Sequence, residues 1–182
     1  MNSQSQIQNP TNSYLRDMNP EKQEAVRQEI RTFFRQLNNM FFMFLAGIFL
    51  FLITALVVVF FQKALSPDYT TFLYFGAPIS SVALMIMARK LASDRFKAAV
   101  GRQKLYEKMD AYRLGAILQM ILLDGSAFIF LLAYIFSGEK LFIFLSLVVV
   151  MMFFLYKPGM EKFIRELQLS EIEKQVIRDH SY

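Results

Sequence analysis

Asp124 is the residue of this chain whose position most needs a chemical or structural explanation. It lies inside a long apolar stretch, eleven residues beyond Arg113. At about 1.5 Å of rise per residue this is roughly 16 Å along a helix, near the middle of a bilayer whose hydrocarbon core is about 30 Å thick. An ionised aspartate costs about 2.5–3.5 kcal/mol there, so such carboxyls generally face a bundle interior and mark proton or ion paths.

Hydroxyl groups at a similar depth are the predicted partners of this carboxyl. Ser80, Ser81 and Ser146 lie in the other apolar stretches, which contain no Lys or Arg. A protonated Asp124 would hydrogen-bond one of these hydroxyls and join two helices, at about 1 kcal/mol. The alternatives are a proton- or ion-responsive carboxylate and a polar contact with a partner's helix. We expect an inward-facing side chain, and four neighbours should share its face: Met120, Ile121, Ala127 and Phe128.

The composition excludes most other chemistries. The 182 residues include no cysteine and one histidine, His180, which excludes disulfides, thiolate metal sites, histidine metal cages and catalytic triads. Phosphate-binding loops, nucleophile elbows and dinucleotide fingerprints are also missing from the sequence. We therefore predict no catalytic, cofactor or metal site, and a protein that is not an enzyme.

Four apolar blocks must position Asp124. Hydrophobic residues make up 55% of the chain and charged residues 19%, against about 45–50% and about 25% in typical proteins. The excess is concentrated in residues 40–61, 71–88, 114–136 and 141–156. A helix needs about 20 residues to cross a bilayer; the fourth block is shorter, so Lys140 and Lys157 would have to snorkel. The predicted fold class is all-α, a polytopic membrane protein with four transmembrane helices in two hairpins, plus cytoplasmic amphipathic helices.

Two features refine this fold. Gly76 and Pro78 are expected to kink the second transmembrane helix. A shift of 78 positions aligns the first half with the second and indicates a parallel internal repeat. The aligned pairs are Glu29 with Glu107, Arg35 with Arg113, Leu45 with Leu123, Gly47 with Gly125, and Ala55 with Ala133.

The distribution of Lys and Arg predicts the orientation. Eighteen of the 20 lie before residue 40, between 89 and 113, or after 156, and only Lys63 and Lys140 lie in the other two connections. The positive-inside rule then places both termini in the cytoplasm of a bacterial-type inner (plasma) membrane. The net charge of +5 suits this orientation and contact with membrane lipids, so no nucleic-acid binding is predicted.

The segments outside the blocks should be mainly helical. Residues 1–19 are a predicted disordered tail, and Asn19 and Pro20 are typical of a helix start. Residues 20–39 then form an amphipathic helix, which either lies at the membrane surface or extends the first transmembrane helix. The loop 89–113 should be a helical hairpin around Gly101. The C-terminal tail, residues 157–182, should form two short helices that divide near Leu169.

This organisation favours two functions. The first is a small accessory or structural subunit of the membrane that docks a protein partner, or further copies of itself, through its cytoplasmic helices. The second is an ion- or proton-coupled transport subunit that uses the carboxyl of Asp124. Neither hypothesis names a substrate.

Overall fold

The computed structural model of the protein describes residues 20–62, 70–102 and 105–169, together with 171, 173, 174 and 177. Within these residues the chain is all-helical and contains no strand. Its five helices are α2 (Pro20–Gln62), α3 (Thr70–Val100), α4 (Leu105–Ser137), α5 (Lys140–Leu155) and α6 (Met160–Glu166). The predicted tail 1–19, the helix cap Asn19, and His180 lie outside the described residues.

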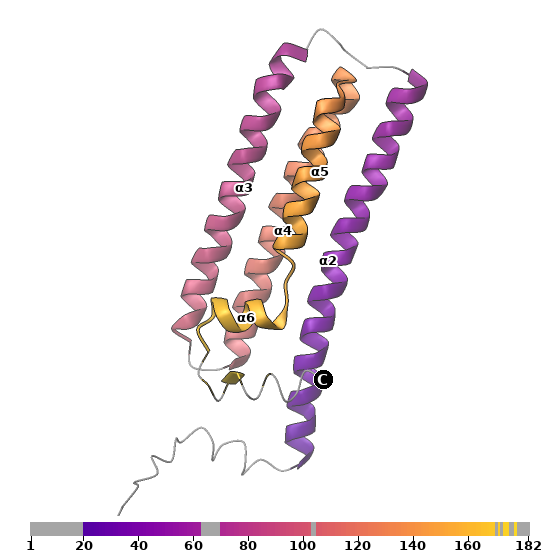
Figure 1. The fold of residues 1–182 in the computed structure, drawn as a ribbon. Coiled ribbons are helices and arrows are strands. Elements are labelled where there is room, and N and C mark those ends of the chain that lie inside the picture. Colours follow the sequence, from indigo (N-terminus) through magenta and orange to yellow (C-terminus); the bar gives the residue numbers. More distant parts are fainter. Residues whose placement is uncertain are drawn as a thin grey trace, which may run out of the picture.

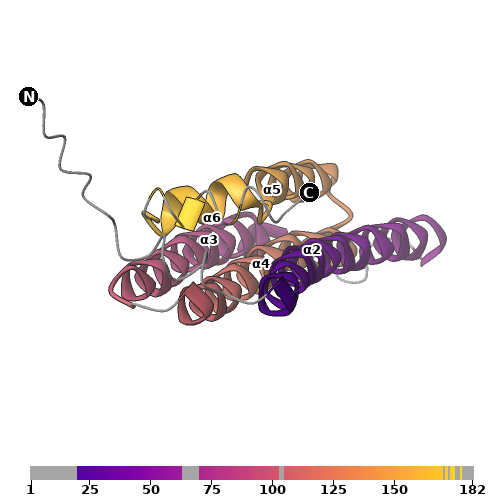
Figure 2. The same ribbon diagram turned by 90° about the horizontal axis from the view of Figure 1, so that it is seen from below.

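Helix α4 is the centre of the structure. Helices α2, α3 and α4 lie side by side in one layer with α4 in the middle, and α5 and α6 form a second layer over it (Figures 1 and 2). The most extensive packing joins α3 to α4, and α4 also packs against α5 and α2. Helices α2 and α3 are consecutive in the chain but hardly touch each other. The predicted first hairpin is therefore not a packed pair, because α4 lies between its two arms.

Each helix begins or ends where the local sequence requires it. Helix α2 runs unbroken through residues 20–39 and on to Gln62, so the amphipathic segment is an extension of the apolar helix. Helix α3 ends just before Gly101, which has open space around its α-carbon. Pro158 cannot continue α5, because its ring leaves no backbone N–H for the helix, and α6 leaves the joint at 76° to α5.

The 78-residue shift matches the first helix of each half but not the second. The first helices agree with the shift, because the aligned residues Leu45 and Leu123 are both buried. The aligned residues Ala55 and Ala133 are both buried as well. The second helices do not agree with it, because α3 starts at residue 70 and a shift of 78 would start α5 at residue 148 instead of 140. The correspondence is thus confined to α2 and α4.

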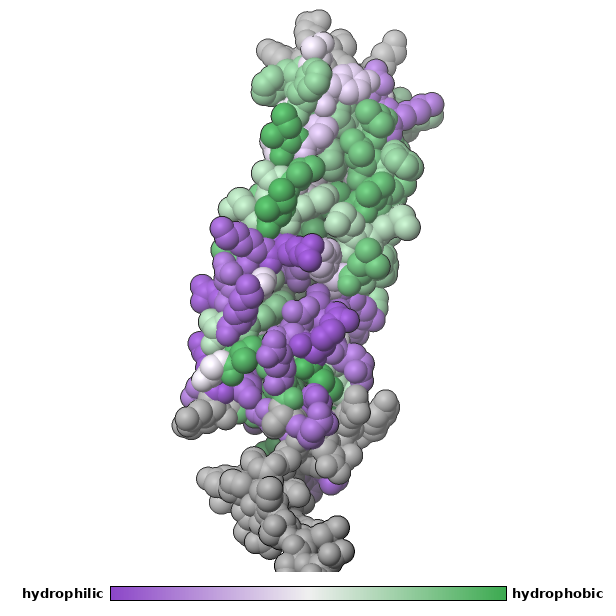
Figure 3. All heavy atoms as spheres, turned by 60° about the vertical axis from the view of Figure 1, so that its left-hand side comes forward, coloured by the Kyte–Doolittle hydropathy of each residue, from purple (hydrophilic) through white to green (hydrophobic). Residues whose placement is uncertain are grey.

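The molecule divides along its length into two parts with different surfaces. We call residues 40–61, 71–88, 114–137 and 140–156 the apolar half. The charged half consists of residues 20–39, 89–102, 105–113 and 157–169, together with 171, 173, 174 and 177. Figure 3 shows the apolar surface of the first and the hydrophilic surface of the second. Three helices, α2, α3 and α4, are long and apolar enough to cross a membrane, and α5 reaches that measure only together with α6.

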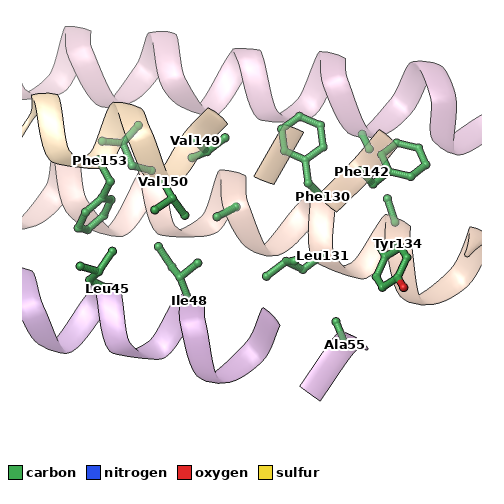
Figure 4. Packing of buried hydrophobic residues seen from close by; sticks show 14 of the residues in the cluster. Leu45, Ile48, Ala55, Phe130, Leu131, Tyr134, Phe142, Val149, Val150 and Phe153 are labelled. Atoms are coloured by element: carbon green, nitrogen blue, oxygen red, sulfur yellow. The ribbon is translucent and has the colours of Figure 1, made fainter. Parts of the chain in front are cut away.

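Each half has its own buried core. In the apolar half, α2, α4 and α5 interdigitate through residues such as Ile48, Leu131 and Val150 (Figure 4). In the charged half, α2, α3, α4 and α6 enclose an aromatic cluster made of Phe33, Phe34, Phe96, Tyr112 and Phe163. The ring of Phe163 contacts three of the others, with centroids 5.0–5.9 Å apart. Helix α6 is thereby fixed against the charged half of α2 and α4.

Candidate functional site

Asp124 lies halfway along α4, at the edge of the apolar core. The residue is half-buried, and its Oδ1 atom is buried without a hydrogen-bond partner among the described residues. Of its predicted neighbours, Met120 and Ala127 are buried, whereas Ile121 is 47% exposed. Asp124 therefore sits on the border between the inward and outward faces of α4.

The predicted serine partners are engaged elsewhere. Ser81 Oγ donates to the backbone oxygen of Ser126 at 3.3 Å. Ser126 Oγ lies 3.2 Å from the backbone oxygen of Ser81 and 3.0 Å from that of Leu122 in its own helix. The two buried hydroxyls thus join α3 to α4. Residues two apart on a helix are separated by about 200°, so Ser126 faces α3 while Asp124 turns away from it. Among the described residues, Ser81 therefore bonds Ser126 and does not reach the buried Oδ1 of Asp124.

The other predicted residues lie apart from Asp124. Ser80 is exposed on α3, and Ser146 is buried on α5. Gly76 and Pro78 lie within α3, which continues through both of them. Phe128, one turn beyond Asp124, contacts Phe51 of α2 at 4.7 Å between ring centroids. Asp124 is accordingly on the α2 side of α4.

A second polar centre, which the sequence did not reveal, surrounds Lys162 on α6. Its Nζ donates to the backbone oxygen of Tyr156 at 3.1 Å and lies 3.4 Å from Gln119 Oε1. Burial lowers the pKa of Lys162 to about 8, although nearby Glu166 acts in the opposite direction. Together with Arg89, these residues line a cavity of about 280 Å³. Gln119 lies six residues after Arg113, inside the predicted apolar block 114–136. A polar residue within that block was the only sequence signal that could have pointed to this centre.

An ion pair joins Glu173 of the C-terminal tail to Lys108 of α4. Lys108 Nζ lies 2.7 Å from Glu173 Oε1, and the two side chains are 10% and 16% exposed. Because buried charges require partners, Glu173 holds its segment against α4. The sequence spacing of 65 residues gave no indication of this pair.

A groove of about 430 Å³ runs between α2 and α4 in the charged half. Its walls are mainly polar and include Glu29, Gln36, Asp110 and Arg113. At its edge Tyr106 is 58% exposed, and tyrosine is a residue type enriched where proteins bind one another.

Among the described residues, no group of three or more His, Cys, Asp and Glu residues is placed to hold a metal ion. In comparisons with known proteins, no protein-family model, no curated protein and no solved structure matches this chain.

Proposed function

We propose that the protein is an integral membrane protein with four transmembrane helices, whose charged half lies in the cytoplasm and docks a protein partner. The observation that carries this proposal is the separate core of the charged half. That core gives the segments outside the membrane a fixed shape, as a docking platform needs, and the groove between α2 and α4 lies on it.

The four-span topology is supported by helix length and charge. Helix α5 has 16 residues, about 24 Å at 1.5 Å per residue, and Lys140 and Lys157 stand at its two ends. Lysine side chains reach several ångströms toward the headgroups, which lets a short helix span. The basic residues gathered in the charged half orient it toward the cytoplasm.

Cysteine labelling tests this topology directly, since the chain has no cysteine of its own. We expect Ser66→Cys and Glu139→Cys to react with an impermeant thiol reagent in intact cells. Asp94→Cys should react only after the cells are opened. Labelling of position 94 in intact cells would reverse the orientation. Labelling of Ser181→Cys, which follows α5 in the sequence, in intact cells would remove the fourth span.

The groove between α2 and α4 is the proposed docking surface. Glu29 and Asp110 line it together with Arg113, and Tyr106 stands exposed at its edge. Buried interface charges must be paired, so the partner should present at least one cation to the two carboxylates and an apolar side chain to Tyr106.

Photo-crosslinking in cells tests the docking surface. A photoreactive phenylalanine analogue at Tyr106 should give a product heavier than the 21.2-kDa chain that contains a different protein. The matched control is the same group at Val100, which is 38% exposed and lies outside the groove. Glu29→Lys should lower the yield from position 106 severalfold. Equal yields from both positions, or products that contain only this chain, would contradict the proposal.

A second function, ion- or proton-coupled transport, is favoured by the carboxyl of Asp124. Its buried oxygen without a partner among the described residues is unusual for a group that would only join helices, because an unsatisfied buried polar atom costs about 1–3 kcal/mol. Asp124→Asn removes the titration and keeps the shape. Transport measured in proteoliposomes should be abolished by this change, whereas transport equal to wild type would eliminate Asp124 as the coupling residue.

A further inference from the structure

A cleft of about 440 Å³ lies where α2 passes the joint between α5 and α6. Arg31, Phe34, Arg35 and Asn38 of α2 form one wall, and residues 157–160 form the other. Small-molecule sites commonly have volumes of about 300–1,000 Å³. The cleft is therefore large enough for a polar head group.

The charge of this cleft is uniformly positive. Arg31, Arg35 and Lys157 line it, no acidic residue does, and in the part of the chain that the structure describes none of the three forms an ion pair. Arg31 and Arg35 are four residues apart on one helix face, a spacing at which like charges repel. An anion between these cations would remove that repulsion.

The cleft also lies at the border between the two halves. Lys157 Nζ is 5.8 Å from the ring centroid of Phe41 and 5.4 Å from that of Phe42. From this border into the apolar half, α2 and α5 carry exposed apolar side chains, among which Phe42 and Phe154 are each 50% exposed. A ligand with an anionic head and an apolar tail would meet cations and apolar surface in the matching order.

We propose that this cleft binds the phosphoryl head group of an anionic glycerophospholipid, with the acyl chains along Phe42 and Phe154. Basic pockets between helices on the cytoplasmic side of a membrane bind such head groups, and Arg holds phosphate oxygens through paired N–H donors. Asn38 adds a neutral donor at the same wall. This inference rests on the proposed placement of the protein in a membrane.

The chain has no tryptophan, so one introduced residue reports lipid contact without background. The Phe42→Trp variant would be reconstituted in two sets of phosphatidylcholine vesicles. One set contains acyl-brominated phosphatidylglycerol and the other an equal fraction of acyl-brominated phosphatidylcholine, and the quenching of the tryptophan fluorescence is measured in each. Each cation near a membrane surface contributes about 1 kcal/mol to binding an anionic lipid, which is about fivefold in affinity. We expect phosphatidylglycerol to be preferred at position 42 by at least fivefold.

Two controls separate the cleft from general attraction to the membrane. Phe60→Trp, at an 82% exposed position near the far end of α2, should be quenched equally by both lipids. The combined change Arg31→Gln, Arg35→Gln and Lys157→Gln should abolish the preference at position 42. The matched combination Lys90→Gln, Arg95→Gln and Lys97→Gln removes the same charge from exposed positions of α3 and should leave it intact.

The outcomes are distinct. Equal quenching by both lipids at position 42, or equal loss of preference in the two triple variants, overturns the lipid site. Relief of the quenching by inorganic phosphate beyond the effect of sodium chloride at the same ionic strength also overturns it, in favour of a soluble phosphorylated ligand. Absence of quenching at both positions 42 and 60 contradicts the membrane placement itself.

Discussion

Substitution of Gly115 by alanine should destabilise the charged half, because the ring of Phe96 on α3 lies directly against this glycine of α4. An added Cβ would lie 2.6, 3.1 and 3.3 Å from three ring atoms of Phe96, whereas carbon atoms normally pack at about 3.5–4.0 Å. The ring would have to retreat by about 1 Å. It is 95% buried and stacked on Tyr112 at 5.0 Å between centroids, so it has little room to retreat.

The size of the effect follows from two opposing contributions. Overpacking of a core costs about 1–3 kcal/mol, and replacing a helical glycine by alanine returns up to about 1 kcal/mol. Gly47 provides the matched control, since a Cβ there would have no neighbour within 4 Å. The free energy of unfolding should therefore be about 1–3 kcal/mol lower for Gly115→Ala than for Gly47→Ala.

Unfolding of both variants in mixed micelles, followed by circular dichroism, measures this difference. Phe96→Leu in the Gly115→Ala background should be less harmful than in the wild type, because it removes the ring that clashes. The coupling energy between the two sites should be about 0.5–3 kcal/mol, as for residues in contact. Equal stability of the Gly115→Ala and Gly47→Ala variants, or additive effects at 96 and 115, would refute the argument.

Three further predictions concern polar groups. Because burial lowers the pKa of Lys162 to about 8 from 10.5, the unfolded chain binds more protons between these values. The free energy of unfolding should thus rise with pH over that window, measured relative to Lys162→Met, and a flat difference would contradict it. Lys108→Met should cost about 1.5–3 kcal/mol, as for a hydrogen bond to a charged group, because it removes the 2.7 Å contact with Glu173. Glu173→Gln in the same background should restore part of the loss in thermal unfolding. Ser126→Ala should lower the free energy of unfolding by about 0.6 kcal/mol. If the two hydroxyls form one unit, the double variant with Ser81→Ala should lose less free energy of unfolding than the sum of the losses in the two single variants.

Local signals in the sequence predicted the helices well. Gly101 and Pro158 mark breaks because one favours irregular backbone and the other cannot donate a hydrogen bond, and both effects act within a few residues. The helical form of the four apolar blocks follows from their length and composition in the same way. The unbroken helix from Pro20 to Gln62 is one of the two alternatives that the pattern allowed.

The neighbours of Asp124 could not be predicted by the same means. Depth along the helix placed Ser81 near it, but the rotation of α4 decides which side chain meets which helix. In an apolar helix nearly every face is hydrophobic, so no periodicity marks the face that packs; here Ser126 faces α3 and Asp124 does not. Gly115 similarly gave no sign of the ring against it.

With the apolar half in a membrane, as proposed above, each half is held together by different forces, and this difference explains why α2 depends on the charged half. In hydrocarbon, lipid tails solvate an apolar side chain as well as a neighbouring helix does, so association there relies on close packing. Helix α2 packs against α4 in the apolar half through a narrow row that includes Leu45, Ile48 and Ala55, and exposes most of its other large side chains. In water, by contrast, burying a side chain such as Phe33 contributes about 1.5–3 kcal/mol. The position of α2 beside Asp124 is therefore determined largely by contacts made outside the apolar half, through Phe33 and its neighbours on α6.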